Sequence, residues 1–196
     1  MYRVSSVVAA FSRIRDGNDV VQPKQGLSYA ANFLYMLNGK EPEALEVEAI
    51  DKSLVLHADH ELNASTFTSR VCVATLSDIY SGITAALGAL KGPLHGGANE
   101  QVMAMLLEIG EVDNAIPYVR EKLANKEKIM GMGHRVYKTG DPRAKHLKKM
   151  SRELTALKDM EKWYIMSELI EEFIKNEKGL PANVDFYSAS VYHSLG

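Results

Sequence analysis

The sequence predicts an all-α protein, and three observations carry that prediction. Apolar residues recur every three or four positions along most of the chain, which is the spacing of one buried helix face. No convincing run of alternating β-branched residues competes with this pattern. Glycine, proline and asparagine stand where the apolar periodicity stops, as they do at the ends of helices.

Nine helices are expected, each from its own apolar stripe. In chain order, the stripes cover residues 27–37, 43–57, 67–74, 79–90, 102–107, 116–123, 147–157, 166–173 and 184–195. The third helix begins at Asn63 or Ser65, because both side chains accept hydrogen bonds from a first helical turn. Asn38-Gly39 is typical of a C-cap, and Gly92-Pro93 ends the fourth helix. The other stop signals are Gly110 after the fifth helix and Gly179-Leu180-Pro181 after the eighth.

The composition is that of a globular protein and excludes several classes of function. A net charge of −2 over 196 residues leaves no electrostatic footprint for nucleic acid or for an anionic membrane. No stretch of about 18 apolar residues is present, so no transmembrane helix is expected. The single cysteine, Cys72, rules out an internal disulfide and a cysteine-based zinc site.

The first residues, MYRVSSVVAAFSRIRDG, are only superficially similar to a signal peptide. Their apolar stretch is short, and Arg13, Arg15 and Asp16 follow it in place of a cleavage site. A reducing, cytoplasmic location is therefore the simplest expectation.

One internal boundary is indicated by composition. Residues 63–98 are rich in alanine, serine, threonine and glycine, which favours closely packed helices, whereas residues 111–178 are rich in lysine and glutamate. The Gly92–Gly97 break lies near this change. A hinge there would put His95 between two subdomains, where clefts commonly form.

Three histidines stand in breaks of the helical pattern, and a carboxylate stands in a fourth. His60 lies in HADHE, His95 in GPLHGGANE, His134 in GMGHRVYKTGDPR and Asp185 in NVDFYS. Histidine exchanges a proton at little cost near neutral pH. These residues therefore predict an acid–base site assembled from distant segments.

Each of these segments also has a structural interpretation. His57, His60 and the acids beside them are compatible with a metal site, although a helix end explains them as well. His95 is either a neutral hydrogen-bond donor or an incidental residue of a glycine-rich cap. Arg143, at the positive end of a helix, indicates either an anionic ligand or a salt bridge to an acidic neighbour. Asp185 or Asn183 could simply cap the last helix.

The joint order of HADHE, GPLHGGANE, GMGH…DPR and NVDFYS closely resembles that of the citrate synthases, in their bacterial form. The similarity extends over essentially the whole chain, and the motifs are specific in combination. The 2-methylcitrate synthases share them, so the resemblance identifies the family more firmly than the acyl substrate.

The resemblance implies a role for each of the singled-out residues. His60 would contact oxaloacetate, and His134 would hydrogen-bond and polarise its carbonyl. Arg143 would bind an oxaloacetate carboxylate. His95 would stabilise the enol of acetyl-CoA, and Asp185 would take the proton from its methyl group.

The resemblance also implies how coenzyme A is held. The turn formed by Ile129, Met130, Gly131, Met132 and Gly133 would lie against the adenine, mostly through backbone atoms. Acetyl-CoA and oxaloacetate would be substrates, and neither a permanently bound cofactor nor a metal is expected.

In the family, a large helical domain is built from both ends of the chain and a small domain is inserted between them. Residues 1–95 would be part of the large domain, residues 96–182 the small domain, and residues 183–196 the helix that returns to the large domain. The family carries further chain before Met1 and after Gly196, including two substrate-binding arginines. The 196-residue chain is therefore expected to be a poor or inactive catalyst. A homodimer is expected, because the helices flanking HADHE resemble those of the family's dimer interface.

Three further hypotheses remain open. The first is a 2-methylcitrate synthase that uses propionyl-CoA. The second is an inactive helical fragment that only binds a ligand or a partner, and the third is a histidine-rich metalloprotein.

Overall fold

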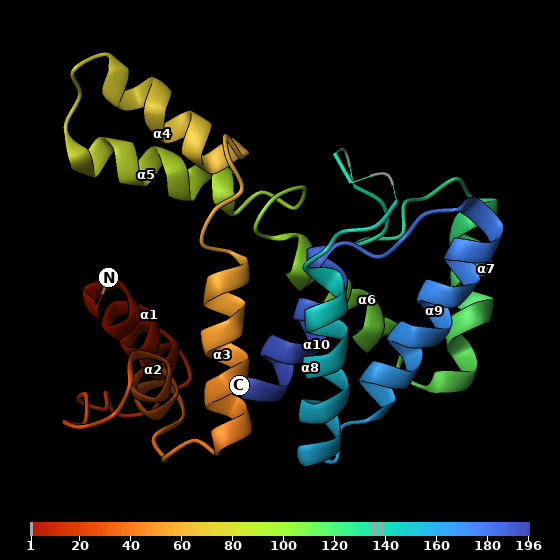
Figure 1. The fold of residues 1–196 in the computed structure, drawn as a ribbon, viewed down its shortest axis with the longest axis horizontal. Coiled ribbons are helices and arrows are strands. Elements are labelled where there is room, and N and C mark those ends of the chain that lie inside the picture. Colours follow the sequence, from red (N-terminus) through yellow and green to blue (C-terminus); the bar gives the residue numbers. More distant parts are fainter. Residues whose placement is uncertain (1, 135, 138) are drawn as a thin grey trace.

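A computed structural model describes residues 2–134, 136–137 and 139–196, and the fold is helical throughout that part of the chain (Figure 1). The elements are α1 (Tyr2–Arg15), α2 (Tyr29–Asn38), α3 (Ala44–Leu56), α4 (Ala64–Ala74), α5 (Ile79–Leu90), α6 (Ala98–Ile109), the 3-10 turn η1 (Val112–Asn114), α7 (Ala115–Ala124), α8 (Ala144–Leu157), α9 (Lys162–Lys178) and α10 (Val184–Leu195). The described residues form no strand beyond one isolated bridge between Met132 and Ala182. The all-α prediction is confirmed.

The nine expected helices are all present, with the stop signals where the sequence places them. Gly39 adopts a left-handed conformation at φ 72° and caps α2 through a bond to the Tyr35 carbonyl. Asn63, not Ser65, caps α4, because its side chain accepts the N–H of Thr66. None of the described helices combines the length and the apolar character needed to cross a bilayer.

Helix α1 is not among the helices that the sequence predicts. Its small residues Ser5 and Ala9 face the interior, while Val7 and Phe11 are 67% and 66% exposed. The periodic apolar signal of α1 therefore comes from a face that lies on the surface.

Helix α8 begins later than its sequence signal. The Asp141-Pro142 pair predicts proline at the first helical position and Arg143 in the first turn. The helix begins instead at Ala144, and Arg143 is its N-cap residue without a capping side chain of its own. The Asp141 carboxylate accepts the Arg143 N–H at 3.0 Å, so the turn that precedes the helix is held by an acid two residues upstream.

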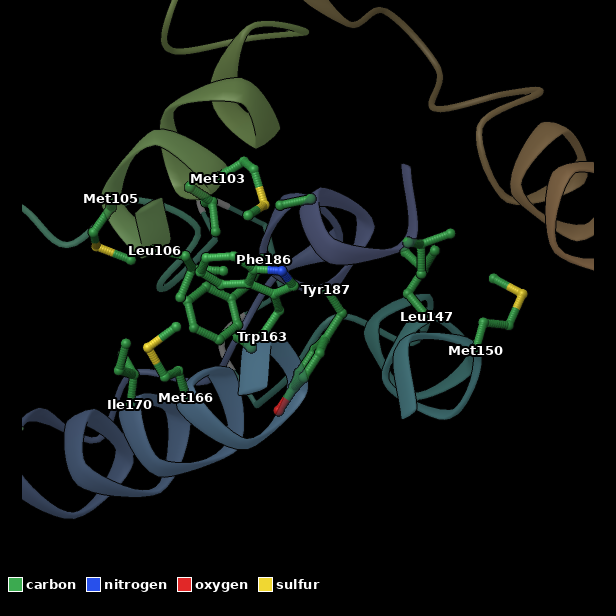
Figure 2. Close-up of a cluster of buried hydrophobic side chains, with 14 of the residues drawn as sticks. Met103, Met105, Leu106, Leu147, Met150, Trp163, Met166, Ile170, Phe186 and Tyr187 are labelled. Atoms are coloured by element: carbon green, nitrogen blue, oxygen red, sulfur yellow. The ribbon is translucent and has the colours of Figure 1, made fainter. Parts of the chain in front are cut away.

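The core is centred on α10, which packs against α8 and α6 (Figure 2). Phe186 and Tyr187 are completely buried on α10, and each buried aromatic ring of this size contributes roughly 2–3 kcal/mol. Small residues let α8 and α10 approach closely, since Ser151 and Ser190 are buried and share a 2.7 Å hydrogen bond. Asp185 lies in the first turn of this buried helix.

Helices α4 and α5 form a hairpin that projects away from the other helices (Figure 1). The two helices meet closely at Gly82, where an added Cβ would lie 2.7 Å from Val73 Cγ1. At the base of the hairpin, Ser65 of α4 is hydrogen-bonded to His95 of the segment GPLHGGANE.

Candidate active site

His60 and His134 come from segments that are far apart in the sequence and lie side by side in the structure. Their ring centroids are 5.5 Å apart, and the Tyr137 ring lies 5.9 Å from His60 and 4.7 Å from His134. The N–H groups of Val136 and Tyr137 both donate to His134 Nδ1, at 3.0 and 3.1 Å. Because Nδ1 accepts these bonds, neutral His134 carries its proton on Nε2, which is then a hydrogen-bond donor.

His95 is held by the first turn of α4. The N–H of Ser65 donates to His95 Nε2 at 3.2 Å, and the Ser65 hydroxyl oxygen is 3.0 Å from the same nitrogen. That hydroxyl is also 2.8 Å from the Asn63 side-chain oxygen and donates to it. Nε2 is therefore unprotonated in the neutral ring, and Nδ1 carries the proton.

The backbone N–H beside His95 comes from another helix than the sequence pattern indicates. The sequence GGANE predicts that N–H groups at the start of α6 lie beside His95, whereas the N–H group that donates to His95 is that of Ser65 in α4. The two glycines serve close packing instead. An added Cβ at Gly96 would lie 2.7 Å from the Leu90 carbonyl, and one at Gly97 would lie 2.9 Å from the Lys91 carbonyl.

Arg143 and Asp141 form a two-bond ion pair. Arg143 Nε and Nη2 donate to the two carboxylate oxygens at 2.9 and 2.8 Å, and Asp141 is only 6% exposed. One of these oxygens also accepts the N–H of Val184 at 3.0 Å. Burial acts to raise the pKa of the Asp141 carboxyl, but Arg143 and the backbone N–H groups outweigh it, so the pKa is lowered.

The sequence reasoning assigned Asp141 only a helix-start role. The structure shows that its carboxylate joins the Arg143 segment to the first turn of α10, 43 residues further on. The local alternative for Arg143, a salt bridge to an acidic neighbour, is thus present, and the guanidinium also lies 5.8 Å from the Tyr137 ring. The spacing of Asp141 and Arg143, two residues apart, was the sequence feature from which this ion pair could have been predicted.

Asp185 lies in the first turn of α10, where the Asn183 side chain accepts its N–H at 2.9 Å. Burial raises the pKa of the Asp185 carboxyl; the positive charge of Arg143 partly opposes that rise, and the negative charge of Asp141 adds to it. Arg143 acts on Asp185 through its charge, and its partner Asp141 is bonded to the same turn of α10. His57, for which the sequence favours a helix-end role, does end α3, and its Nδ1 lies 2.8 Å from the Ser53 carbonyl oxygen.

The raised pKa of Asp185 leads to a stability prediction. A carboxyl whose folded pKa is raised stabilises the protein most at low pH, and that contribution is lost as the pH rises through the folded pKa. Asp185→Asn removes the buried charge, so we expect its unfolding midpoint at pH 7 to rise by a few degrees.

Thermal unfolding of both proteins between pH 4 and pH 8 measures this effect. The advantage of the variant should shrink as the pH falls toward the ordinary aspartate range. If the stability of Asp185→Asn relative to the parent is instead lower at pH 7 than at pH 4, the pKa of Asp185 is not raised in the folded protein.

The turn at residues 129–133 is fastened to the segment that leads into α10. Gly133 N–H donates to the Pro181 carbonyl at 2.7 Å, and Asn183 N–H donates to the Gly131 carbonyl at 2.9 Å. The Asn183 amide donates to the Gly133 carbonyl at 2.8 Å. Three hydrogen bonds thus fix the turn directly beside Asp185.

A cavity of about 500 Å³ opens along this turn. Ile129, Met130, Gly131 and Met132 line it together with Asp185, whereas Gly133 does not. Lys128 and Lys178 supply positive charge to the lining, and Glu127 supplies negative charge beside them. The volume lies within the range of sites that hold cofactor-sized ligands. In the described part of the chain, no group of three or more histidine, cysteine or acidic side chains is arranged to hold a metal ion.

Comparison with known proteins gives consistent matches. A family model described as "Citrate synthase, C-terminal domain" matches residues 1–196. Citrate synthase 2 of Bacillus subtilis is 71% identical over 194 residues, which are 99% of this chain and 52% of that protein. The 2-methylcitrate synthase of Mycobacterium tuberculosis is 44% identical over 191 residues, which are 97% of this chain and 49% of that protein.

A solved structure of citrate synthase from the archaeon Thermoplasma acidophilum, in ternary complex with carboxymethyl coenzyme A and oxaloacetate, superposes with a TM-score of 0.92. It is 42% identical in sequence, and the match covers 99% of this chain and 52% of that one. The chain spans about half the length of the relatives it matches.

Proposed function

Because the chain belongs to the citrate synthase family, we propose that its histidine cluster condenses acetyl-CoA with oxaloacetate to give citrate and CoA. What supports this proposal is that His134 and Arg143 both lie beside Tyr137, and that Asp141, the partner of Arg143, is bonded to the first turn of α10, where Asp185 lies. A thioester methyl group is a very weak acid, so a base and a donor to the forming enolate oxygen have to act together.

Asp185 and His95 supply that base and that donor. Burial raises the pKa of Asp185, which makes its carboxylate a stronger base for the methyl proton. The bond from Ser65 to His95 Nε2 leaves the proton on Nδ1, and this N–H donates to the enolate oxygen. The new C–C bond then forms between the enol carbon and the oxaloacetate carbonyl carbon, and water later hydrolyses citryl-CoA.

His60, His134 and Arg143 bind oxaloacetate in this proposal. The Nε2–H of His134 donates to the keto oxygen and makes its carbon more electrophilic. Arg143 holds a carboxylate with the N–H groups that do not face Asp141. His60, which lies 5.5 Å from His134, contacts the same molecule.

The cavity along residues 129–133 holds coenzyme A. Its apolar lining suits the adenine ring, and Lys128 and Lys178 suit the phosphates. Residues 1–95 and 96–182 would act as two domains that close over the ligands, with residues 183–196 returning to the first, and the reaction would take place in the cytoplasm.

Calorimetry and rate measurements on this chain test the proposal. We expect oxaloacetate to bind, and Arg143→Gln to weaken binding about 10- to 100-fold, the effect of a lost charge-assisted hydrogen bond. Release of the CoA thiol measures turnover, which is expected to be slow for this chain alone, and His95→Ala should lower that residual rate about 10²- to 10³-fold. A folded chain that binds neither oxaloacetate nor CoA would overturn the proposal.

The 2-methylcitrate alternative concerns only the acyl group. Because the chain is similar to the 2-methylcitrate synthase of Mycobacterium tuberculosis, propionyl-CoA is tested beside acetyl-CoA. We expect faster thiol release from acetyl-CoA than from propionyl-CoA, and the opposite ratio would assign the second activity.

We propose further that two copies of the chain associate through the α4–α5 hairpin. Its apolar side chains are largely exposed, including Val71 (53%), Ile79 (67%) and Ile83 (52%). Contiguous exposed apolar surface of this kind marks an interaction site.

Light scattering tests this association. We expect a dimer mass at micromolar concentration and a monomer mass for Ile83→Asp. Leu107→Asp on α6 is the matched control, because Leu107 is equally exposed (52%) but lies outside the hairpin. A parent chain of monomer mass would end this proposal.

A further inference from the structure

Tyr137 is a common neighbour of the three side chains that bind oxaloacetate in the proposed reaction. Its ring centroid lies 4.7 Å from that of His134 and 5.9 Å from that of His60, with interplanar angles of 34° and 39°. The Arg143 Cζ atom lies 5.8 Å from the centroid of the same ring. A guanidinium at this distance is attracted to the face of an aromatic ring. The proposed reaction itself gives Tyr137 no role.

The backbone of Tyr137 also acts on His134. The N–H groups of Tyr137 and Val136 donate to His134 Nδ1, at 3.1 and 3.0 Å. A nitrogen that accepts these bonds cannot carry a proton, so the proton of the neutral ring stays on Nε2. The tautomer of His134 therefore depends on where the backbone of these two residues is held.

Of these two donor residues, Tyr137 is the one whose side chain can hold the backbone in place. The Val136 side chain is 67% exposed, so its packing contributes little to the turn. Tyr137 is half-buried, and its ring is tilted against His134 and His60. Aromatic rings at such distances attract one another beyond the effect of the area they bury. The ring of Tyr137 thus anchors the N–H groups that bind Nδ1.

We propose that Tyr137 is a positioning residue of the oxaloacetate site. Its ring fixes the turn that selects the Nε2–H tautomer of His134, and the same ring supports His60 and the face of the Arg143 guanidinium. The effect on the tautomer follows from geometry alone, whereas the effect on oxaloacetate rests on the proposed function. The contacts come from the ring and the backbone, so the phenol hydroxyl is dispensable.

Three variants separate the ring from the bulk of the side chain. Tyr137→Phe keeps the flat ring, and Tyr137→Leu keeps an apolar side chain without a flat face. Val136→Ala is the matched control, because Val136 donates its N–H to the same nitrogen but its side chain is exposed. If Tyr137 only fills space, the leucine variant should behave like the phenylalanine variant. Circular dichroism verifies that all three are folded.

Nitrogen-15 NMR of the histidine rings, at a pH where they are neutral, reads the tautomer. The chain has six histidines, and the His134 signals are those absent from His134→Gln. We expect two well-separated nitrogen signals for the parent, Tyr137→Phe and Val136→Ala. In Tyr137→Leu they should move toward each other, because the two tautomers then exchange. An unchanged separation in the leucine variant overturns the proposal.

Calorimetry with oxaloacetate tests the second effect. We expect Tyr137→Leu to weaken binding about tenfold, roughly the effect of one well-oriented hydrogen bond, and the other two variants to stay within about twofold of the parent. Equal weakening by Tyr137→Phe would assign the effect to the hydroxyl and contradict the proposal, as would full affinity in Tyr137→Leu. If the parent itself does not bind oxaloacetate, the proposed function fails, while a tautomer shift in Tyr137→Leu still supports the action of Tyr137 on His134.

Discussion

Asp141→Ala is expected to destabilise the chain by about 3 kcal/mol, the usual result of removing one partner from a buried ion pair. The substitution leaves Arg143, whose side chain is only 14% exposed, without its two carboxylate acceptors. It also leaves the Val184 N–H without its acceptor. The loss therefore combines an uncompensated charge with an unsatisfied backbone donor at the first turn of α10.

Denaturant unfolding at several pH values measures this loss. The lowered pKa of Asp141 means that its contribution is present above the ordinary aspartate range and is lost as the pH falls through the folded pKa. The difference between parent and variant should therefore narrow in acid. Asp141→Asn keeps an oxygen acceptor without the charge, and we expect roughly half the loss.

Asp141→Ala should also weaken oxaloacetate binding if Arg143 holds a substrate carboxylate, because the guanidinium loses the group that orients it. A variant that is as stable as the parent and binds oxaloacetate equally would show that the ion pair neither supports α10 nor positions Arg143. The asparagine variant separates the two roles, since it keeps the fold closer to the parent.

The helices could be predicted from the sequence because their signals are local. The apolar stripe of α2 and the Gly39 cap lie within one short segment, and the same holds for α4 and Asn63. Helix α1 was not predicted, although its apolar residues recur at helical spacing. Those residues face outward and its inward face is made of small residues, so the apolar pattern would have placed the wrong face in the core.

The sequence names a set of candidate residues, but it does not give their arrangement. The motifs named His95 and Asp185, and the order of the motifs indicated the family. The proton-bearing nitrogen of His95 is set by Ser65, which is 30 positions away. Similarly, the link from Asp141 to Val184 spans 43 positions. Contacts of this kind depend on tertiary packing, which no local pattern encodes.

Gly131→Ala is the substitution that tests most directly whether the 129–133 turn is shaped by packing. Gly131 has φ +77°, where an L side chain costs roughly 1–2 kcal/mol. An added Cβ would also lie 2.9 Å from Phe186 Cβ and 2.9 Å from Val102 Cγ2. Overpacking of a well-filled core costs a further 1–3 kcal/mol or so, and we expect a total loss of about 3 kcal/mol.

Gly179→Ala is the matched control, because Gly179 has φ +67° and nothing within 4 Å of the added Cβ. Unfolding in denaturant should show a loss of about 1 kcal/mol for this control, so the difference between the two variants isolates the packing contribution. Equal losses would mean that the turn does not press against Phe186.

The same pair of variants connects this packing to ligand binding. Gly131 lies between Phe186 and the cavity that also borders Asp185, so a Cβ there displaces the turn toward the cavity. Calorimetry should find CoA bound at least tenfold more weakly by Gly131→Ala than by Gly179→Ala. Because the turn is hydrogen-bonded to residues 181–183, its displacement also shifts the start of α10. If one glycine shapes both the proposed CoA site and the turn that carries Asp185, Gly131→Ala should lose CoA binding and stability together.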